Sequence, residues 1–205
     1  MSNTTLLVTL AKPEPDQAEV FHGYVEASTQ LALEAGGEVS SRFGVRHIHG
    51  DAPAVVFGLA TFPSVQAVSD MFAAPEYQSL IPARDKSIEH VNAYTVADTP
   101  ITALADLDGD GVYLVTVAAP NPDGAEALAT YQQAVGPLFS RHGAAPVAQL
   151  PVSDHPVGET PAGFIGVVTF PSAQAVDALF ADPDYLAVVD ARNEGLLALN
   201  LYVTT

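Results

Sequence analysis

The chain has 205 residues, of which about half are apolar and 15% are charged, as in a globular protein. Its formal net charge of -17 disfavours binding to nucleic acid or to an anionic membrane, and the absence of cysteine excludes disulfides, thiolate metal sites and a cysteine nucleophile. The sequence shows no signal-peptide pattern and no apolar run of roughly 18 residues, so we expect a cytoplasmic protein.

In chain order, the first half alternates between short β-branched runs and segments with apolar residues at helical spacing. The helical segments are bounded by turn residues such as Gly36-Gly37 and Pro63-Ser64. The expected elements are a strand at 6–11, a helix at 17–35, strands at 38–48 and 54–62, a helix that begins at Pro63-Ser64, and a strand at 88–96.

The second half repeats the first. Residues 61–96 align with 169–204 without a gap, so that TFPSVQAV returns as TFPSAQAV, and residues 7–19 align with 114–126. Such self-similarity indicates a repeated structural unit. We expect a first unit at 1–97, a linker at 98–111 and a second unit at 112–205.

The order βαββαβ in each unit is the ferredoxin-like arrangement, an antiparallel sheet with two helices on one face. The last strand of the second unit, 196–203, carries few polar residues on either face, which predicts a sheet that is buried on both sides. The expected fold class is therefore α+β, with two tandem ferredoxin-like units packed sheet to sheet as a fused dimeric α/β barrel.

The stretches FPSVQAVSDMFAAPEYQSLIPAR (62–84) and FPSAQAVDALFADPDYLAVVDAR (170–192) resemble the signature of a small domain family of unknown function in the dimeric α/β-barrel superfamily. That superfamily includes cofactor-independent antibiotic-biosynthesis monooxygenases, muconolactone isomerases, polyketide cyclases and haem enzymes. The resemblance implies a pocket between sheet and helices in each unit. Members often carry a tryptophan near Phe72 and Phe180, whereas this chain has none.

The strand RFGVRHIHG at 42–50 is the densest polar stretch. Its alternation places Phe43, His47 and His49 on one face, where two imidazoles could transfer protons, hydrogen-bond a substrate or begin a metal site. The alternative is a partly exposed strand end with two ordinary histidines. The second unit keeps only His155 near this place, so a catalytic site here would belong to the first unit.

Arg84 and Arg192 occupy equivalent positions, seven residues after Tyr77 and Tyr185. Each could anchor a carboxylate or an enolate oxygen, or form a structural ion pair or cap helix carbonyls.

The last strand of the first unit places His90, Asn92 and Tyr94 on one face. These side chains could line a pocket or bind backbone across the domain interface. The acidic stretch DLDGDG at 106–111 resembles the start of a calcium loop, but Val117 stands where the bidentate glutamate is needed, so we expect a linker.

From these observations and the resemblance we predict a small-molecule tailoring enzyme, of natural-product or polyketide-like biosynthesis, that performs cofactor-independent oxygenation, cyclisation or isomerisation. The alternative is a non-catalytic ligand-binding or assembly module. We expect no cofactor and no metal, with haem as a further possibility that only the resemblance suggests. The expected partner is a largely apolar, oxygen-bearing small molecule, and the expected state is a monomeric pseudo-dimer or a dimer of pseudo-dimers. The predicted catalytic residues are His47, His49 and Arg84, and the predicted substrate-binding residues are Phe43, Phe72, His90, Asn92 and Tyr94.

Overall fold

The computed structural model describes residues 4–97, 107 and 111–204, which form two compact units. The expected linker at 98–111, with its acidic stretch, lies almost entirely outside the described residues. Each unit follows the order βαββαβ with antiparallel strand pairs, so each is an α+β unit of ferredoxin-like type.

Two short segments group differently from the contiguous boundaries 1–97 and 112–205. Residues 46–51 belong with the second unit and residues 151–160 with the first. Some side chains of the predicted histidine strand therefore lie in the first unit and others in the second.

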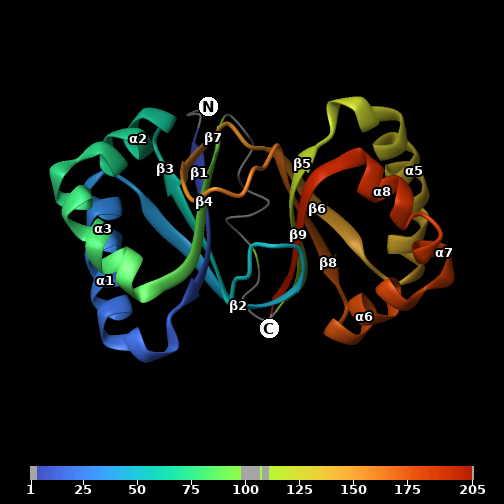
Figure 1. Cartoon of the computed structure of the whole chain (residues 1–205), viewed down its shortest axis with the longest axis horizontal. Coiled ribbons are helices and arrows are strands. Elements are labelled where there is room, and N and C mark those ends of the chain that lie inside the picture. The colour runs from blue at the N-terminus through green and yellow to red at the C-terminus, as the bar shows by residue number, and fades with distance from the viewer. Residues whose placement is uncertain (1–3, 98–106, 108–110, 205) are drawn as a thin grey trace. The chain divides into compact units, whose positions relative to one another are not determined.

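In the first unit the helices cover one face of a sheet with the strand order β2-β3-β1-β4-β7 (Figure 1). Leu7, Phe62, Val68 and Met71 form its core between sheet and helices. The elements are β1 (Thr5–Pro13), a 3-10 turn (Pro15–Gln17), α1 (Ala18–Glu34), β2 (Glu38–His49), β3 (Val56–Phe62), α2 (Val65–Ala73), α3 (Pro75–Ser87) and β4 (Ile88–Val96), joined by β7 (Asp154–Val157).

The second unit repeats this plan with the strand order β6-β8-β5-β9. Figure 1 shows its helices on one face of the sheet as well. The elements are β5 (Val112–Pro120), a 3-10 turn (Pro122–Gly124), α5 (Ala125–Arg141), β6 (Ala145–Pro151), β8 (Phe164–Phe170), α6 (Ala173–Ala181), α7 (Pro183–Leu186), α8 (Val189–Gly195) and β9 (Leu196–Thr204).

The helix expected after Pro63-Ser64 is interrupted. α2 ends before Ala74, whose backbone is extended (φ -62°, ψ 140°), and α3 begins at Pro75. The proline ring disfavours helical geometry in the preceding residue, which explains the break. The start of this helical segment was predicted, whereas its division into two helices was not.

The duplicated phrase at 61–68 and 169–176 serves the fold. Phe62 and Phe170 end their strands in the two cores. Ser64 Oγ accepts a hydrogen bond from Ala67 N at 3.1 Å, and Ser172 Oγ accepts one from Ala175 N at 3.2 Å. Each serine thus caps the following helix, which fixes the chain as it turns from strand to helix.

Candidate functional site

A cavity lies between the sheet and the helices in each unit. Its volume is about 470 Å³ in the first unit and about 550 Å³ in the second. Both volumes are in the range of small-molecule binding sites. The two cavities are related by the repeat, because Leu7, Thr9 and Tyr24 in one correspond to Leu114, Thr116 and Tyr131 in the other.

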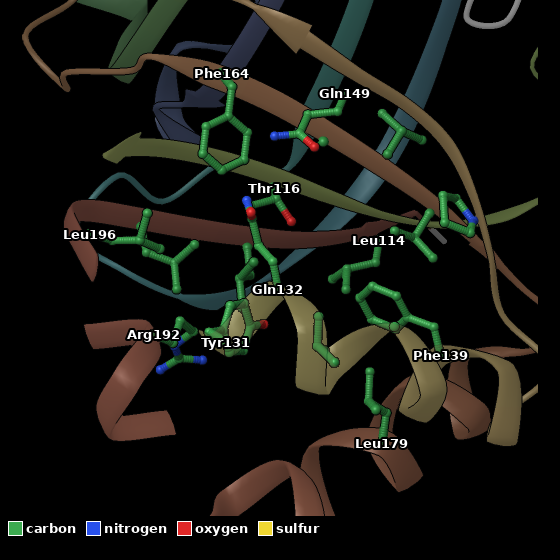
Figure 2. A pocket seen from close by; sticks show the side chains of 18 of the residues that line it. Leu114, Thr116, Tyr131, Gln132, Phe139, Gln149, Phe164, Leu179, Arg192 and Leu196 are labelled. Carbon is green, nitrogen blue, oxygen red and sulfur yellow. The ribbon is translucent and has the colours of Figure 1, made fainter. Parts of the chain in front are cut away.

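The cavity of the second unit carries a buried arginine at one end. Arg192, from α8, is only 6% exposed, and its Nη1 donates to Tyr185 Oη at 2.8 Å. Tyr131, from α5, lines the same end (Figure 2). Burial, with the neighbouring Tyr185 adding to it, raises the pKa of Tyr131 well above its usual range. Tyr131 therefore stays protonated at neutral pH and can donate a hydrogen bond.

Most of the remaining wall of this cavity is apolar. Phe180 meets the ring of Tyr185 edge to face, with centroids 5.1 Å apart. Figure 2 shows Phe139 and Phe164 on other parts of the wall, and Gln132 reaching from α5 toward the strand that carries Thr116. The site thus combines a mainly apolar space with a cation and hydrogen-bond donors, an arrangement that orients a ligand by its oxygen atoms.

The first unit has the same groups with a different charge balance. Tyr24 Oη and Tyr77 Oη are 3.2 Å apart, and burial raises the pKa of Tyr24, with the nearby Tyr77 adding to the effect. Arg84 lies beyond this pair, and its Nε and Nη2 both bind Asp85 Oδ1 at 2.8 Å. In the second unit the corresponding partner is an amide, because Arg192 Nε and Nη2 donate to Asn193 Oδ1 at 3.2 and 3.0 Å.

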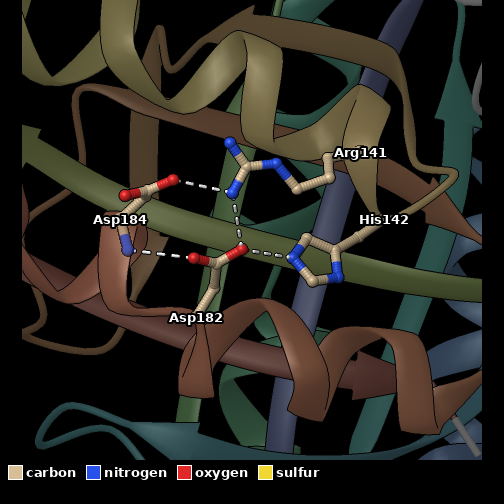
Figure 3. A network of polar contacts seen from close by, with 4 residues as sticks. All are labelled: Arg141, His142, Asp182 and Asp184. Carbon is tan, nitrogen blue, oxygen red and sulfur yellow. Dashed lines mark hydrogen bonds and ion pairs between the residues drawn. The ribbon is translucent and has the colours of Figure 1, made fainter.

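The helices around the second cavity are fastened by a polar network (Figure 3). Asp182 Oδ2 binds His142 Nε2 at 2.9 Å and Arg141 Nη1 at 3.1 Å, and Asp184 binds the same arginine at 2.7 Å. The bond from His142, followed by the backbone N–H of Asp184, lowers the pKa of Asp182. The network ties the end of α5 to the start of α7 and so fixes the helical wall.

The predicted histidines lie elsewhere. His47 packs on Tyr202 with ring centroids 5.3 Å apart, and its buried Nε2 finds no hydrogen-bond partner in the described parts of the chain. Burial, and next the charge of Arg192, lower the pKa of His49. Neither histidine lines either of the two cavities described above. Their catalytic role stays a prediction that the cavity geometry does not support.

Asn92 and Tyr94 hold segment 151–160 rather than lining a cavity. Asn92 Oδ1 accepts from Thr160 N at 3.2 Å, and Tyr94 Oη donates to Thr160 O at 3.0 Å. The ring of His155 stacks on Tyr94 with centroids 4.5 Å apart. Of the two interpretations of this pair, the contacts favour the binding of backbone.

The other predicted residues are divided. Phe43 and Phe72 line the cavity of the first unit. His90 is on the surface, with its Nε2 3.5 Å from Glu89 Oε1. Arg84 binds Asp85 and is not part of the cavity lining in the described chain.

Arg192 was one of two candidate anchors in the sequence, but neither Arg192 nor the tyrosines of the two cavities were among the predicted site residues. Tyr24 and Tyr131 match in the repeat, as do Tyr77 and Tyr185, and this coincidence was the signal that could have found them. The alignment of the two halves did not show that both tyrosines of a unit line the same cavity.

His155 provides a prediction about pH. Its Nε2 is buried without a hydrogen-bond partner among the described residues, and burial lowers its pKa below the unfolded value of about 6.5. Protonation therefore costs more in the folded chain, so the free energy of unfolding should be fully retained above pH 6.5 and should decrease as the pH falls through the folded pKa. Urea unfolding at several pH values measures this.

The matched variant is His155→Phe, which keeps a ring on Tyr94 but cannot titrate. The difference in unfolding free energy between wild type and variant should change between pH 7.5 and pH 5. A constant difference over this interval would show that His155 contributes nothing to the pH dependence.

An antiparallel sheet with helices on one face and a ligand-sized cavity between them places each unit in the ferredoxin-like class. Comparison with known proteins agrees with this class. Residues 112–203 match the family model described as "Domain of unknown function (DUF1330)". A comparison with curated proteins found no match to the sequence.

Solved structures with the same fold include an anthrone oxidase-like protein and a mutant chlorite dismutase from Candidatus Nitrospira defluvii. The first has a TM-score of 0.60 and 17% identity, over 100% of this chain and 92% of the other. The second has a TM-score of 0.56 and 9% identity, over 98% of this chain and 91% of the other. At these identities the likeness concerns the fold.

The lining of the second cavity also bears on cofactors. Among the described residues it contains no histidine, cysteine or methionine, so a haem placed there would lack an axial ligand of these types. Tyrosine is the remaining type, since Tyr131 and Tyr185 both line the cavity and the phenol of Tyr185 accepts a hydrogen bond from Arg192. None of the described helices is long and apolar enough to cross a bilayer.

Proposed function

We propose that the chain is a small-molecule tailoring enzyme whose second-unit cavity holds a largely apolar, oxygen-bearing substrate of polyketide-like type. The observation that carries the proposal is the buried Arg192–Tyr185 pair at one end of an apolar space of about 550 Å³. A buried cation beside a hydrogen-bond donor favours negative charge on a bound oxygen, and does so more strongly than in water.

Arg192 would act on an enol, a phenol or a ketone with an acidic neighbouring C–H. Loss of a proton from such a molecule places negative charge on oxygen, where the guanidinium and the phenol of Tyr131 stabilise it. The resulting anion can transfer electrons to dioxygen, close a ring or shift a double bond, so that no cofactor is required. An anthrone, the molecule named in one fold neighbour, is a flat ketone of this kind.

No histidine or carboxylate lines this cavity among the described residues, so solvent water would accept the proton, and Arg192 would favour this transfer by lowering the pKa of the substrate. The same feature favours the alternative, a module that binds such a molecule without changing it. In both cases the open cavity supports a ligand, since a module filled by its own side chains would leave no such space. The sheet-to-sheet packing, tandem duplication and oligomeric state remain predictions.

The test begins with native mass spectrometry of the purified chain, which should show a bound small molecule that denaturation releases. Incubation of the released molecule with protein and dioxygen should convert it, and Tyr131→Phe should lower the rate about 100-fold. Tyr24→Phe is the matched control in the first unit and should leave the rate unchanged. Recovery of the molecule unchanged would contradict catalysis and favour the binding module.

A further inference from the structure

The two cavities are repeats of each other, yet one position next to the conserved arginine differs in charge. Asp85 follows Arg84, and Asn193 follows Arg192. Each of these two side chains accepts hydrogen bonds from the Nε and Nη2 of its arginine. The contacts are alike, but the first acceptor is a carboxylate and the second is a neutral amide.

This exchange changes the charge that each cavity offers. Asp85 forms an ion pair with Arg84 at 2.8 Å and balances its charge. No carboxylate forms an ion pair with Arg192 in the part of the chain that the structure describes, and its other partner, Tyr185, is a neutral phenol. Among the described residues, the two side chains that accept hydrogen bonds from the buried guanidinium of Arg192, Tyr185 and Asn193, are both neutral.

A buried charge is costly unless an opposite charge or strong hydrogen bonds compensate it. Arg192 is only 6% exposed and lines the second cavity. Arg84 does not line the first cavity. The cavity next to Arg192 has a predominantly apolar wall and can accept a molecule that brings the missing negative charge. The surface charge of -17 repels anions in general, so such a ligand would be recognised at Arg192 and not at the surface.

We infer that the second cavity, and not the first, selects a ligand with an anionic oxygen on an apolar body, such as a carboxylate, a phenolate or an enolate. The anionic oxygen binds the guanidinium of Arg192, and the apolar body lies against Phe180 and Leu179. This inference rests on the proposed function, because it names the ligand class of the same site. The neutral partner of Arg192 and the position of Arg192 in the cavity lining together distinguish the second cavity from the first.

The experiment compares two probes of equal shape by isothermal titration calorimetry. The probes are 2-naphthoate, which is an anion at pH 7, and 2-naphthamide, which is neutral. Wild-type protein should bind one 2-naphthoate per chain about 10- to 100-fold more tightly than 2-naphthamide, the range expected for a hydrogen bond to a charged group.

Asn193→Asp gives the second cavity the charge balance of the first and should remove this preference for 2-naphthoate. Asp85→Asn is the reciprocal change and should leave binding to the second cavity at least as tight. Both positions are exposed, so neither exchange should disturb the core, and circular dichroism verifies that the variants are folded.

The outcomes separate the inference from the proposal on which it rests. If both probes bind with equal affinity and Asn193→Asp changes nothing, the cavity binds small molecules but does not select an anion, and the inference is overturned. If neither probe binds to any of the three proteins, the proposed small-molecule site itself is contradicted.

Discussion

Arg192→Met is expected to weaken binding of 2-naphthoate at least 100-fold without destabilising the unliganded protein. Methionine has a similar length and fills the space of the arginine stem, but it cannot bind an oxyanion. Because Arg192 is buried without a carboxylate partner, its removal should leave the free energy of unfolding unchanged or raise it by about 1 kcal/mol. Calorimetry measures the binding, and urea unfolding measures the stability.

This variant separates the two roles that the sequence left open for the arginines. If the arginine is structural, its replacement should lower the free energy of unfolding of the protein by several kcal/mol. If it binds the ligand, its replacement should lower only the affinity for 2-naphthoate. Arg84→Met is the matched control, because Arg84 has its own carboxylate outside the cavity lining. Arg84→Met should lower the free energy of unfolding by about 0–1 kcal/mol, and its affinity for 2-naphthoate should stay within about threefold of the wild-type value. A loss of stability above about 2 kcal/mol for Arg192→Met would identify Arg192 as structural.

Gly158→Ala is expected to destabilise the first unit by about 2–4 kcal/mol. Gly158 has φ +98°, a conformation that residues with a side chain rarely adopt. A Cβ atom there would also collide with Asn92 Oδ1 and with the backbone oxygen of Val91. The alanine would therefore displace segment 151–160 from β4, and thermal unfolding would show a lowered Tm.

The control is Gly23→Ala, in α1 of the same unit, where a Cβ meets nothing within 4 Å. This exchange should raise stability by about 0.5–1 kcal/mol, because alanine is the better helix former. Gly50, with φ +100° and a Cβ that would meet Asn200 and Leu199, should respond as Gly158 does. If Gly158→Ala were as stable as wild type, the contact between segment 151–160 and Asn92 would not support the fold.

The paths of segments 46–51 and 151–160 explain why the predicted histidines do not line the two cavities described above. His47 and His155 occupy equivalent positions in the repeat, and each packs on the tyrosine of a last strand, Tyr202 or Tyr94. In the sequence these histidines alternate with other residues along a strand, and polar residues that line a pocket show the same alternation. A side chain at such a position can face a ligand or another strand, and only the paths of the segments distinguish the two.

The order of the elements in each unit and the helix start after each copy of the duplicated phrase could be predicted from the sequence. These features follow from local rules, because strand alternation, helical spacing and a serine cap depend on residues that are close in the chain. The break at Ala74, where the following proline divides the helical segment, was not predicted, although the same kind of local rule accounts for it.

Only the tertiary structure decided where the candidate chemistry lies. The sequence offered two arginines at equivalent positions and several histidines, with no means to rank them. The folded chain places Arg192 and Tyr185 at the end of a cavity and gives Arg84 a carboxylate partner. The burial of an arginine and the balance of its charge depend on which groups surround it after folding. They are therefore properties of the folded molecule.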